Sequence, residues 1–251
     1  MDRKKRYKFG QNYLKDPIVI NNILSAIKPT GSKVLEIGPG NGALTFGLLK
    51  KHSLTCIEID HENIQYLKNN IETSSVEIIH HDFLSWKPLT SNMFEIIVGN
   101  LPYNISSQIL LRILFEPFQP NAGFFMLQKE MAERIASSPG SRNWSKLSVK
   151  CSLYYQSEIL FEVPPECFDI KPKIMSVFMR MVKKEPLLSS KDAKNFFKFI
   201  DLSFQYKRKT LINNLKTHYS ESSIKRLIDQ NQRPEEVSVE QYVNLFKLLE
   251  K

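Results

Sequence analysis

The sequence is poor in cysteine: Cys56, Cys151 and Cys167 are the only three in a chain of 251 residues. No two of them form a Cys-x-x-Cys pair, which argues against a zinc ribbon or a dithiol redox motif. Cys56 lies in an apolar run, where a buried free thiol is the usual state. The chain is long enough to bury a core without disulfides or a structural metal.

Long apolar runs are also missing. The sequence has no run of about eighteen apolar residues, the length that a transmembrane helix needs. The basic residues at its start are not followed by the apolar segment of a secretory signal. It contains no internal repeats and no low-complexity tracts. These absences favour a reduced, cytoplasmic protein.

Positive charge is in excess, with 35 Lys and Arg against 26 Asp and Glu and a formal net charge of +9. Such a balance favours a polyanionic partner, although a merely solvated basic surface is the alternative. A phosphate backbone would bind clusters of basic residues and release counterions. Two clusters lie outside the apolar segments: Arg3, Lys4, Lys5 and Arg6, and then Lys207, Arg208 and Lys209.

Short apolar runs alternate with amphipathic stretches, a pattern typical of an α/β fold with a mostly parallel sheet. A first helix is expected over 16–27, with Asp16 as its N-cap and Pro17 at its first position. Further helices are predicted from the glycine-rich turn to residue 50, at 61–70, at 106–114, from 129 and at 147–155. Seven strands are predicted, at 33–37, 53–58, 76–80, 94–98, 122–127, 159–163 and 174–182.

The pattern changes after residue 184. Residues 190–251 have helical spacing of apolar residues throughout and contain no strand signal. We therefore predict two domains, residues 1–185 with the sheet and residues 186–251 as a small all-helical domain.

A glycine-rich turn, Gly38-Pro39-Gly40-Asn41-Gly42, follows the first predicted strand, which carries the acidic Glu36. Glycines there allow a ligand to approach the backbone, and a following helix offers unpaired N–H groups. The spacing differs from the G-x-G-x-x-G of dinucleotide-binding folds. It resembles the S-adenosylmethionine site of class I methyltransferases, whose ligand carries an ammonium and a sulfonium that an acidic residue would favour. An ordinary structural turn is the alternative.

Acidic residues lie at or just after the ends of the next two predicted strands. Glu58 at the end of 53–58 is placed to accept ribose hydroxyls, whereas Asp60 is better suited to cap the following helix. Asp82, after 76–80, can accept from an adenine amine. His80 and His81 are adjacent on a strand and point to opposite faces, so a metal site there is not expected. Together these strand ends predict one cofactor cleft.

Asn100-Leu101-Pro102-Tyr103 is the most specific motif. Adenine N6 is a poor nucleophile because its lone pair is delocalised into the ring. The Asn100 amide oxygen and the Leu101 carbonyl could accept hydrogen bonds from its two N–H groups and direct its lone pair at a methyl donor. Pro102 would hold the turn, and Tyr103 would offer a face for the target base. An ordinary turn after a strand is the alternative.

With these motifs in order, the sequence resembles the KsgA-type ribosomal RNA adenine dimethyltransferases of the small ribosomal subunit. The resemblance covers nearly the whole chain. Beyond the motifs above it rests on residues 8–14, 43–45, 104–106, 126–130, 147–149, 163–165, 172–173 and 208–211.

The resemblance implies a Rossmann-like class I methyltransferase domain with a helical C-terminal domain that contacts RNA. It implies dimethylation of two adjacent adenosines in the 3′-terminal hairpin of small-subunit rRNA, with S-adenosylmethionine as methyl donor and no metal. By motif, the cofactor would be bound by Asn12, Leu14, Gly38, Glu58, Asp82 and Asn100. The sequence departs from the family pattern at Trp144-Ser145, Ile170 and Met175, in the RNA-facing loop and the last strands.

Two other functions stay open. Macrolide-resistance methyltransferases of large-subunit rRNA carry a similar Asn-x-Pro-Tyr motif, but more often with Ile at position 101. A non-catalytic RNA-binding assembly or transcription factor could keep the same fold. The intact Asn100 to Tyr103 motif favours an enzyme.

Overall fold

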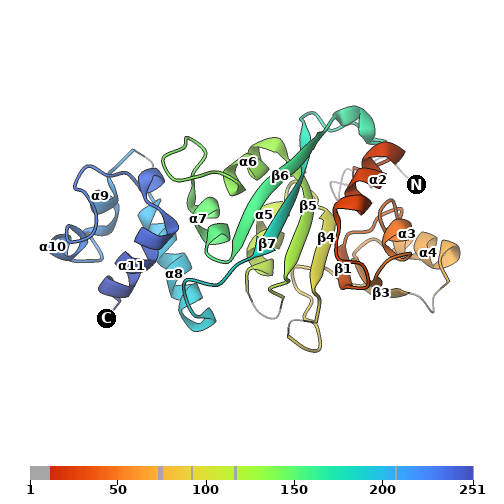
Figure 1. The fold of residues 1–251 in the computed structure, drawn as a ribbon, viewed down its shortest axis with the longest axis horizontal. Coiled ribbons are helices and arrows are strands. Elements are labelled where there is room, and N and C mark those ends of the chain that lie inside the picture. The colour runs from red at the N-terminus through yellow and green to blue at the C-terminus, as the bar shows by residue number, and fades with distance from the viewer. Residues whose placement is uncertain (1–11, 73–75, 92, 116–117, 207, 251) are drawn as a thin grey trace. The chain divides into compact units, whose positions relative to one another are not determined.

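A computed structural model describes residues 12–72, 76–91, 93–115, 118–206 and 208–250. Within them the chain forms two compact units, one of residues up to 132 with 158–183 and one of residues 133–157 with those from 184 onwards. Figure 1 shows their helices and strands in chain order. The basic residues Arg3 to Arg6 and Lys207 lie outside the described residues.

The first unit contains a sheet whose strands, over the described residues, follow the order β3-β2-β1-β4-β5-β7-β6. The strands are β1 Lys33–Ile37, β2 Ser53–Glu58, β3 Val76–His80, β4 Ile96–Asn100, β5 Ala122–Gln128, β6 Tyr155–Val163 and β7 Ser176–Lys183. The first five run parallel, and β7 pairs antiparallel with β5. The predicted mostly parallel seven-stranded sheet is confirmed.

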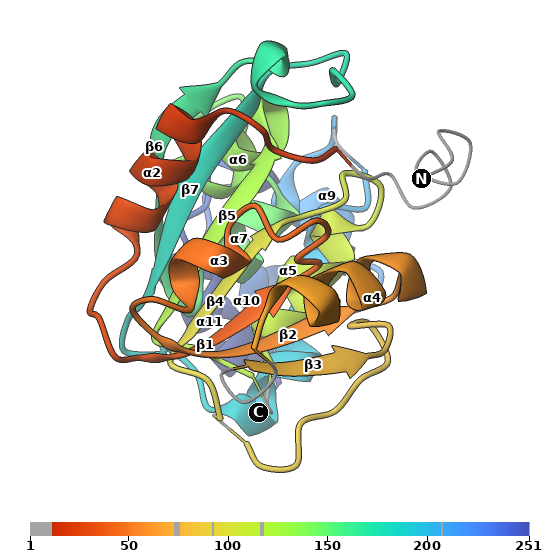
Figure 2. The ribbon, with the colours of Figure 1, turned by 90° about the vertical axis from the view of Figure 1, so that its right-hand side faces the viewer.

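Helices flank this sheet: α2 Pro17–Ala26, α3 Thr45–Leu48, α4 His61–Asn70, α5 Ser106–Ile113 and α6 Lys129–Ile135, with a short 3₁₀ turn η2 at Pro165–Cys167. Figure 2 views the end of the sheet where β1, β2 and β3 lie, with α3 and α4 beside them. Asp16 caps α2 as predicted, because its Oδ1 accepts from the backbone N–H groups of Ile18 and Val19 at 2.9 and 3.0 Å.

The core of the first unit follows from apolar residues on both faces of the central strands. The four residues of β1 after Lys33 are all buried, as expected for a parallel strand covered on both sides. Phe124, Phe161 and Phe178 add a stack of rings from β5, β6 and β7. The three cysteines are free and buried, which confirms the prediction for Cys56.

The second unit is built from α7 Lys146–Ser152, α8 Ser190–Ser203, α9 Leu211–Leu215, α10 Glu221–Ile224, α11 Val239–Leu249 and a 3₁₀ turn η3 at Pro234–Glu236. Rings on α8 and α11 form its core: Phe196 and Phe199 pack against Phe246, and Phe199 also meets Tyr242 edge-on. No helix in the described residues has the length and apolar character that crossing a membrane requires.

Residues 133–157 belong to this second unit, whereas the predicted division left them in the first domain. The reason is packing that the sequence does not reveal. The buried ammonium of Lys150 on α7 donates to both carboxylate oxygens of Asp201 on α8, each at 2.9 Å, and lies 5.1 Å from the centre of the Phe197 ring. Trp144 donates from Nε1 to the Val237 carbonyl at 3.0 Å.

One of the departures from the family pattern, Trp144-Ser145, thus has a local explanation. Trp144 is buried and anchors its loop to the residues after η3. Ser145 caps α7, since its backbone N–H donates to Ser148 Oγ at 2.9 Å in a capping box. Residues 147–155 were predicted as one helix; α7 ends at Ser152, and Tyr155 already begins β6.

The Lys150–Asp201 pair predicts a measurable loss of stability. Asp201→Ala should lower the free energy of unfolding by about 2 kcal/mol, because it leaves a buried ammonium without its counter-ion; half-exposure of Asp201 keeps the loss below that of a fully buried pair. Urea unfolding followed by circular dichroism measures it. Lys146→Met is the matched control: its exposed ammonium lies 3.3 Å from the same carboxylate, and its loss should cost less than about 0.5 kcal/mol. Equal losses would contradict the argument.

Candidate active site

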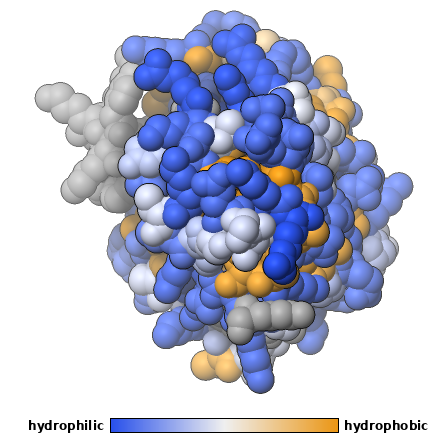
Figure 3. All heavy atoms as spheres, turned by 90° about the vertical axis from the view of Figure 1, so that its left-hand side faces the viewer, coloured by the Kyte–Doolittle hydropathy of each residue, from blue (hydrophilic) through white to orange (hydrophobic). Residues whose placement is uncertain are grey.

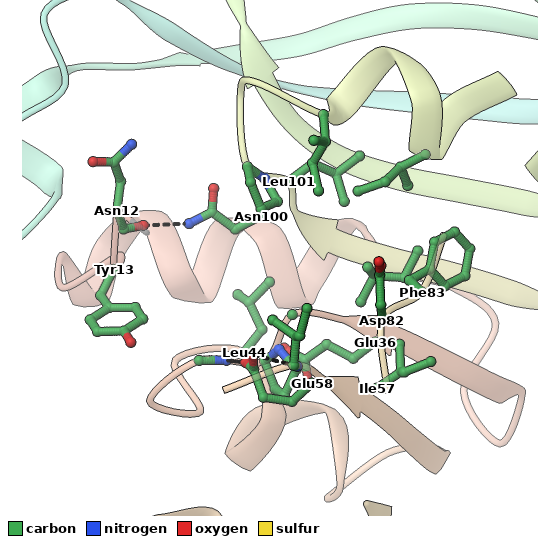
Figure 4. A pocket seen from close by; sticks show the side chains of 18 of the residues that line it. Asn12, Tyr13, Glu36, Leu44, Ile57, Glu58, Asp82, Phe83, Asn100 and Leu101 are labelled. Atoms are coloured by element: carbon green, nitrogen blue, oxygen red, sulfur yellow. Dashed lines mark hydrogen bonds between the residues drawn. The ribbon is translucent and has the colours of Figure 1, made fainter. Parts of the chain in front are cut away.

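A cavity of about 290 Å³ opens where β1, β2 and β4 end at their carboxyl edge. Ligands of α/β sheets bind at this edge. The cavity is lined by residues from five separate stretches of the chain: 12–14, 36–44, 57–59, 81–84 and 100–109. Figure 4 shows several of their side chains. All the predicted cofactor-binding residues, Asn12, Leu14, Gly38, Glu58, Asp82 and Asn100, lie in this lining.

The glycine turn forms the wall between β1 and α3. Gly38 and Gly40 have φ values of +66° and +58°, which residues other than glycine rarely adopt. A Cβ at Gly40 would also lie 2.6 Å from Cε1 of Tyr13. Helix α3 starts only at Thr45 and ends at Leu48, not at 50. The turn therefore lets a ligand approach its backbone closely, but the N–H groups of Gly38 and Gly40 already donate to the Ile57 carbonyl and to Glu58 Oε2. The helix N-terminus lies further along the chain than expected.

Glu36 is buried in the cavity wall. Its Oε2 accepts from Thr45 Oγ1 at 2.7 Å and from Cys56 Sγ at 3.7 Å. Burial raises the pKa of Glu36 to about 7, although both hydrogen bonds oppose this shift. Glu36 therefore carries only part of a negative charge near neutral pH, so its expected electrostatic help to a cationic ligand is weakened.

Glu58 is the best satisfied carboxylate of the site. Its Oε1 accepts from the N–H groups of Ile59 and Asp60 at 2.8 and 2.9 Å. Its Oε2 accepts from the N–H of Gly40 at 3.0 Å and from Asn63 Nδ2 at 3.3 Å. Burial raises the pKa of Glu58, and the four donors counteract part of that shift.

The two other acidic residues near the strand ends lie in different surroundings, and the predicted cap is confirmed only for Asp60. Asp60 caps α4, accepting from the N–H of Glu62 at 3.0 Å. Asp82 is exposed two residues after the end of β3, accepts from the N–H of Leu84 at 2.9 Å and lines the cavity beside Phe83. Among the residues that the structure describes, no group of three or more His, Cys, Asp or Glu side chains could hold a metal ion.

Asn100 is the last residue of β4, which runs from 96 to 100 and not from 94 to 98 as predicted. Its Nδ2 donates to the carbonyl oxygen of Asn12 at 2.7 Å, drawn as a dashed line in Figure 4. Since an amide group is planar, this bond turns Oδ1 away from Asn12. The orientation of the Asn100 amide is thus set by a backbone group of the N-terminal segment.

That segment is itself attached to a distant loop. Leu14 forms an isolated antiparallel bridge with Phe168, and the N–H of Tyr13 donates to Asp169 Oδ1 at 3.1 Å. The N–H of Lys15 donates to the Cys167 carbonyl at 2.8 Å. The sequence marks residues 12–14 only through the family resemblance, because a pairing across about 150 residues leaves no local signal.

Tyr103 lies in the turn after β4 but outside the residues that line the cavity. Its hydroxyl is 2.5 Å from Ser176 Oγ at the start of β7, and burial raises the pKa of Tyr103. Arg208 and Lys209 are exposed in the second unit, and Lys209 Nζ lies 4.6 Å from the centre of the Tyr206 ring.

Comparisons with known proteins decide the family. The family description "Ribosomal RNA adenine dimethylase" matches residues 2–251. The chain belongs to the ribosomal RNA adenine dimethylase family. It is accordingly an S-adenosylmethionine-dependent adenine methyltransferase, and the cavity suits that cofactor, because it combines a glycine turn with carboxylates at two neighbouring strand ends. When bound, the cofactor supplies a methyl group on a sulfonium.

Individual relatives agree with this family. "Ribosomal RNA small subunit methyltransferase A" of Legionella pneumophila (strain Corby) is 40% identical, covering 99% of both chains. The protein of the same name from Flavobacterium johnsoniae is 39% identical over 98% of this chain and 96% of its own. The 23S rRNA methyltransferase ErmE is 26% identical with a TM-score of 0.75, covering 96% of this chain and 100% of its own. A dimethyladenosine transferase from Plasmodium falciparum shares the fold, with 24% identity, a TM-score of 0.79 and coverage of 92% and 95%.

The raised pKa of Glu36 predicts a pH-dependent stability. The unfolded carboxyl ionises near 4.5, whereas the folded one holds its proton to about 7, so the folded state loses stability as pH rises between these values. Glu36→Gln cannot ionise. The difference in free energy of unfolding, Glu36→Gln minus the unaltered enzyme, should therefore rise by about 2 kcal/mol from pH 5 to pH 8.

Urea unfolding at both pH values measures this difference. The exposed Asn70 of α4 supplies the control, because Asn70→Ala changes no ionisable group and should show the same difference from the unaltered enzyme at pH 5 and pH 8. A pH-independent effect of Glu36→Gln would show that Glu36 is ionised throughout.

Proposed function

We propose that this enzyme dimethylates the N6 amines of two adjacent adenosines in the 3′-terminal hairpin of small-subunit rRNA, during small-subunit biogenesis in the cytoplasm. The single observation that carries its chemistry is the bond from Asn100 Nδ2 to the Asn12 carbonyl. That bond leaves Oδ1 of Asn100 as the amide atom available to an incoming N–H group.

The carbonyl of Leu101 supplies the second acceptor. The next two carbonyls of the turn are engaged, Pro102 by the N–H of Ile105 and Tyr103 by Ser106 Oγ. Within the described part of the chain, the Leu101 carbonyl accepts no hydrogen bond. Two acceptors on the N6 hydrogens draw the nitrogen towards a tetrahedral form, which takes its lone pair out of conjugation with the ring and directs it at the methyl donor.

The remaining steps need no general base with a shifted pKa. The bound cofactor would supply the methyl group to the N6 nitrogen, and the resulting ammonium would lose its proton to water. Tyr103 stacks the target base, and its hydroxyl bond to Ser176 holds the ring in one orientation. Glu58 and Asp82 accept from the ribose and adenine parts of the cofactor, while Asn12, Leu14 and Gly38 complete its contacts.

The relatives favour the small ribosomal subunit as the source of the RNA. Those named for it are 36–40% identical over nearly full length, whereas the structure named for 23S rRNA is 26% identical. The face of the C-terminal helices in Figure 3 is largely hydrophilic. Lys191, Lys194 and Lys198 are exposed at helical spacing on α8, and with Arg208 and Lys209 they offer phosphate contacts to RNA. Arg3 to Arg6 and Lys207 are proposed to add to them.

Asn100→Ala tests the chemistry. We expect single-turnover methyl transfer to immature small subunits to fall by about 100- to 1,000-fold at saturating cofactor, because one acceptor on N6 is lost. RNA affinity should change less than about twofold, since phosphate contacts dominate it. The exposed Asn70 on α4 provides the control, as Asn70→Ala should transfer at the normal rate. Lost RNA binding with transfer intact would contradict the mechanism.

The substrate is tested by presenting the enzyme, as a monomer, with immature small subunits, mature small subunits and large subunits. Dimethyladenosine mapped by mass spectrometry should appear at two adjacent positions near the 3′ end of the small-subunit rRNA in immature particles. Modification of large-subunit RNA instead would favour a macrolide-resistance activity. RNA binding without any dimethyladenosine would indicate a non-catalytic assembly factor.

A further inference from the structure

Asn63 is a buried polar residue outside every motif of the sequence. It lies on α4 with only 1% of its surface exposed. Its amide makes two bonds of opposite sense: Oδ1 accepts from the Tyr13 hydroxyl at 2.9 Å, and Nδ2 donates to Glu58 Oε2 at 3.3 Å. Burying an amide costs free energy of folding unless both its oxygen and its nitrogen are hydrogen-bonded. Here the two bonds connect two walls of the cavity.

Tyr13 connects this amide to the N-terminal segment. Its ring lies directly over Gly40, where an added Cβ would come within 2.6 Å of Cε1, and its hydroxyl reaches Asn63. The ring position is thus defined from two sides. The preceding residue, Asn12, presents the carbonyl that receives Nδ2 of Asn100. Figure 4 shows Asn12, Tyr13, Asn100 and Glu58 around the same cavity.

These contacts form a continuous chain from Glu58 through Asn63, Tyr13 and Asn12 to Asn100. Under the proposed function, on which this inference rests, one end holds the ribose of the cofactor and the other holds the adenine amine. We propose that Asn63 and the Tyr13 hydroxyl are positioning residues that align Glu58 for cofactor binding and, through the Asn12 carbonyl, align Asn100 for methyl transfer.

Asn63 supplies the one side-chain donor among the four hydrogen bonds described for Glu58. The other three donors to that carboxylate, Gly40, Ile59 and Asp60, are backbone N–H groups fixed by the chain. Without the Asn63 amide, Glu58 Oε2 would keep one donor, the N–H of Gly40. The Tyr13 hydroxyl would lose the hydrogen bond that it now donates to Asn63 Oδ1. Loss of either hydrogen bond would let Glu58 and the N-terminal segment shift in the cavity wall.

Two substitutions test the chain at different points. Asn63→Leu removes the amide at similar size, and Tyr13→Phe removes only the hydroxyl while the ring stays over Gly40. Isothermal titration with S-adenosylhomocysteine should show affinity lowered about tenfold by Asn63→Leu and about threefold by Tyr13→Phe, the effect of unsatisfied buried polar groups. Single-turnover transfer at saturating cofactor should fall in the same order.

The double variant is decisive. If the two groups act through one chain, Asn63→Leu with Tyr13→Phe should be no worse than Asn63→Leu alone, whereas independent effects would multiply. Tyr66→Phe on the same helix, whose side chain is half exposed, is the matched control and should leave both readouts unchanged. Thermal unfolding of each variant identifies any loss caused by misfolding, and Tyr13→Phe keeps the test valid if Asn63→Leu fails to fold.

The outcomes separate this inference from the proposed function. Unchanged affinity and rate in both variants, or losses that multiply in the double variant, would overturn the inference while rRNA methylation by the unaltered enzyme still stands. Lower affinity without any effect on the saturated rate would overturn the link to Asn100. If the unaltered enzyme methylates no rRNA, the proposed function fails, and the titration still decides the role of Asn63 in binding.

Discussion

The requirement to satisfy the buried carboxylate of Glu58 shapes this site more than any other interaction. An ionised group taken out of water needs donors for its oxygens, and Glu58 has four. The four donors come from three local features. Gly40 belongs to the glycine turn, Ile59 and Asp60 lie between β2 and α4, and Asn63 lies in the first turn of that helix. One side chain therefore fixes the relative placement of the turn, the strand end and the helix.

The N-terminal segment completes the site from the opposite side. Its bridge between Leu14 and Phe168 brings a stretch near the start of the chain to the loop before β7. The segment then supplies the Asn12 carbonyl to Asn100 and the Tyr13 ring to Gly40. The orientation of the amide expected to act on adenine is thus decided by residues 88 positions earlier in the chain. Catalysis by positioning depends on such fixed groups, because a misplaced acceptor contributes little.

Local pattern predicted most of the fold well. The bounds of β1, β2, β3 and α4 agree with the predicted ranges, because apolar runs and caps there coincide with real element ends. The predicted range for β4 stops before Gly99 because glycine is disfavoured in strands, yet Gly99 belongs to this strand. A Cβ at that position would lie 2.7 Å from Leu101 Cδ2 and 3.0 Å from the Ile37 carbonyl. Close packing, which no window of sequence reports, requires glycine there.

Sequence alone is enough to assign the α/β class, the carboxylates at the strand ends and the Asn100 to Tyr103 motif, because strand ends of a parallel sheet meet at one edge whatever the details. Packing in three dimensions sets three further features: the raised pKa of Glu36, the link from Tyr13 through Asn63 to Glu58, and the attachment of α7 to the helical unit through Lys150. Each of these depends on burial or on contacts between residues distant in sequence. Local spacing carries no information about either.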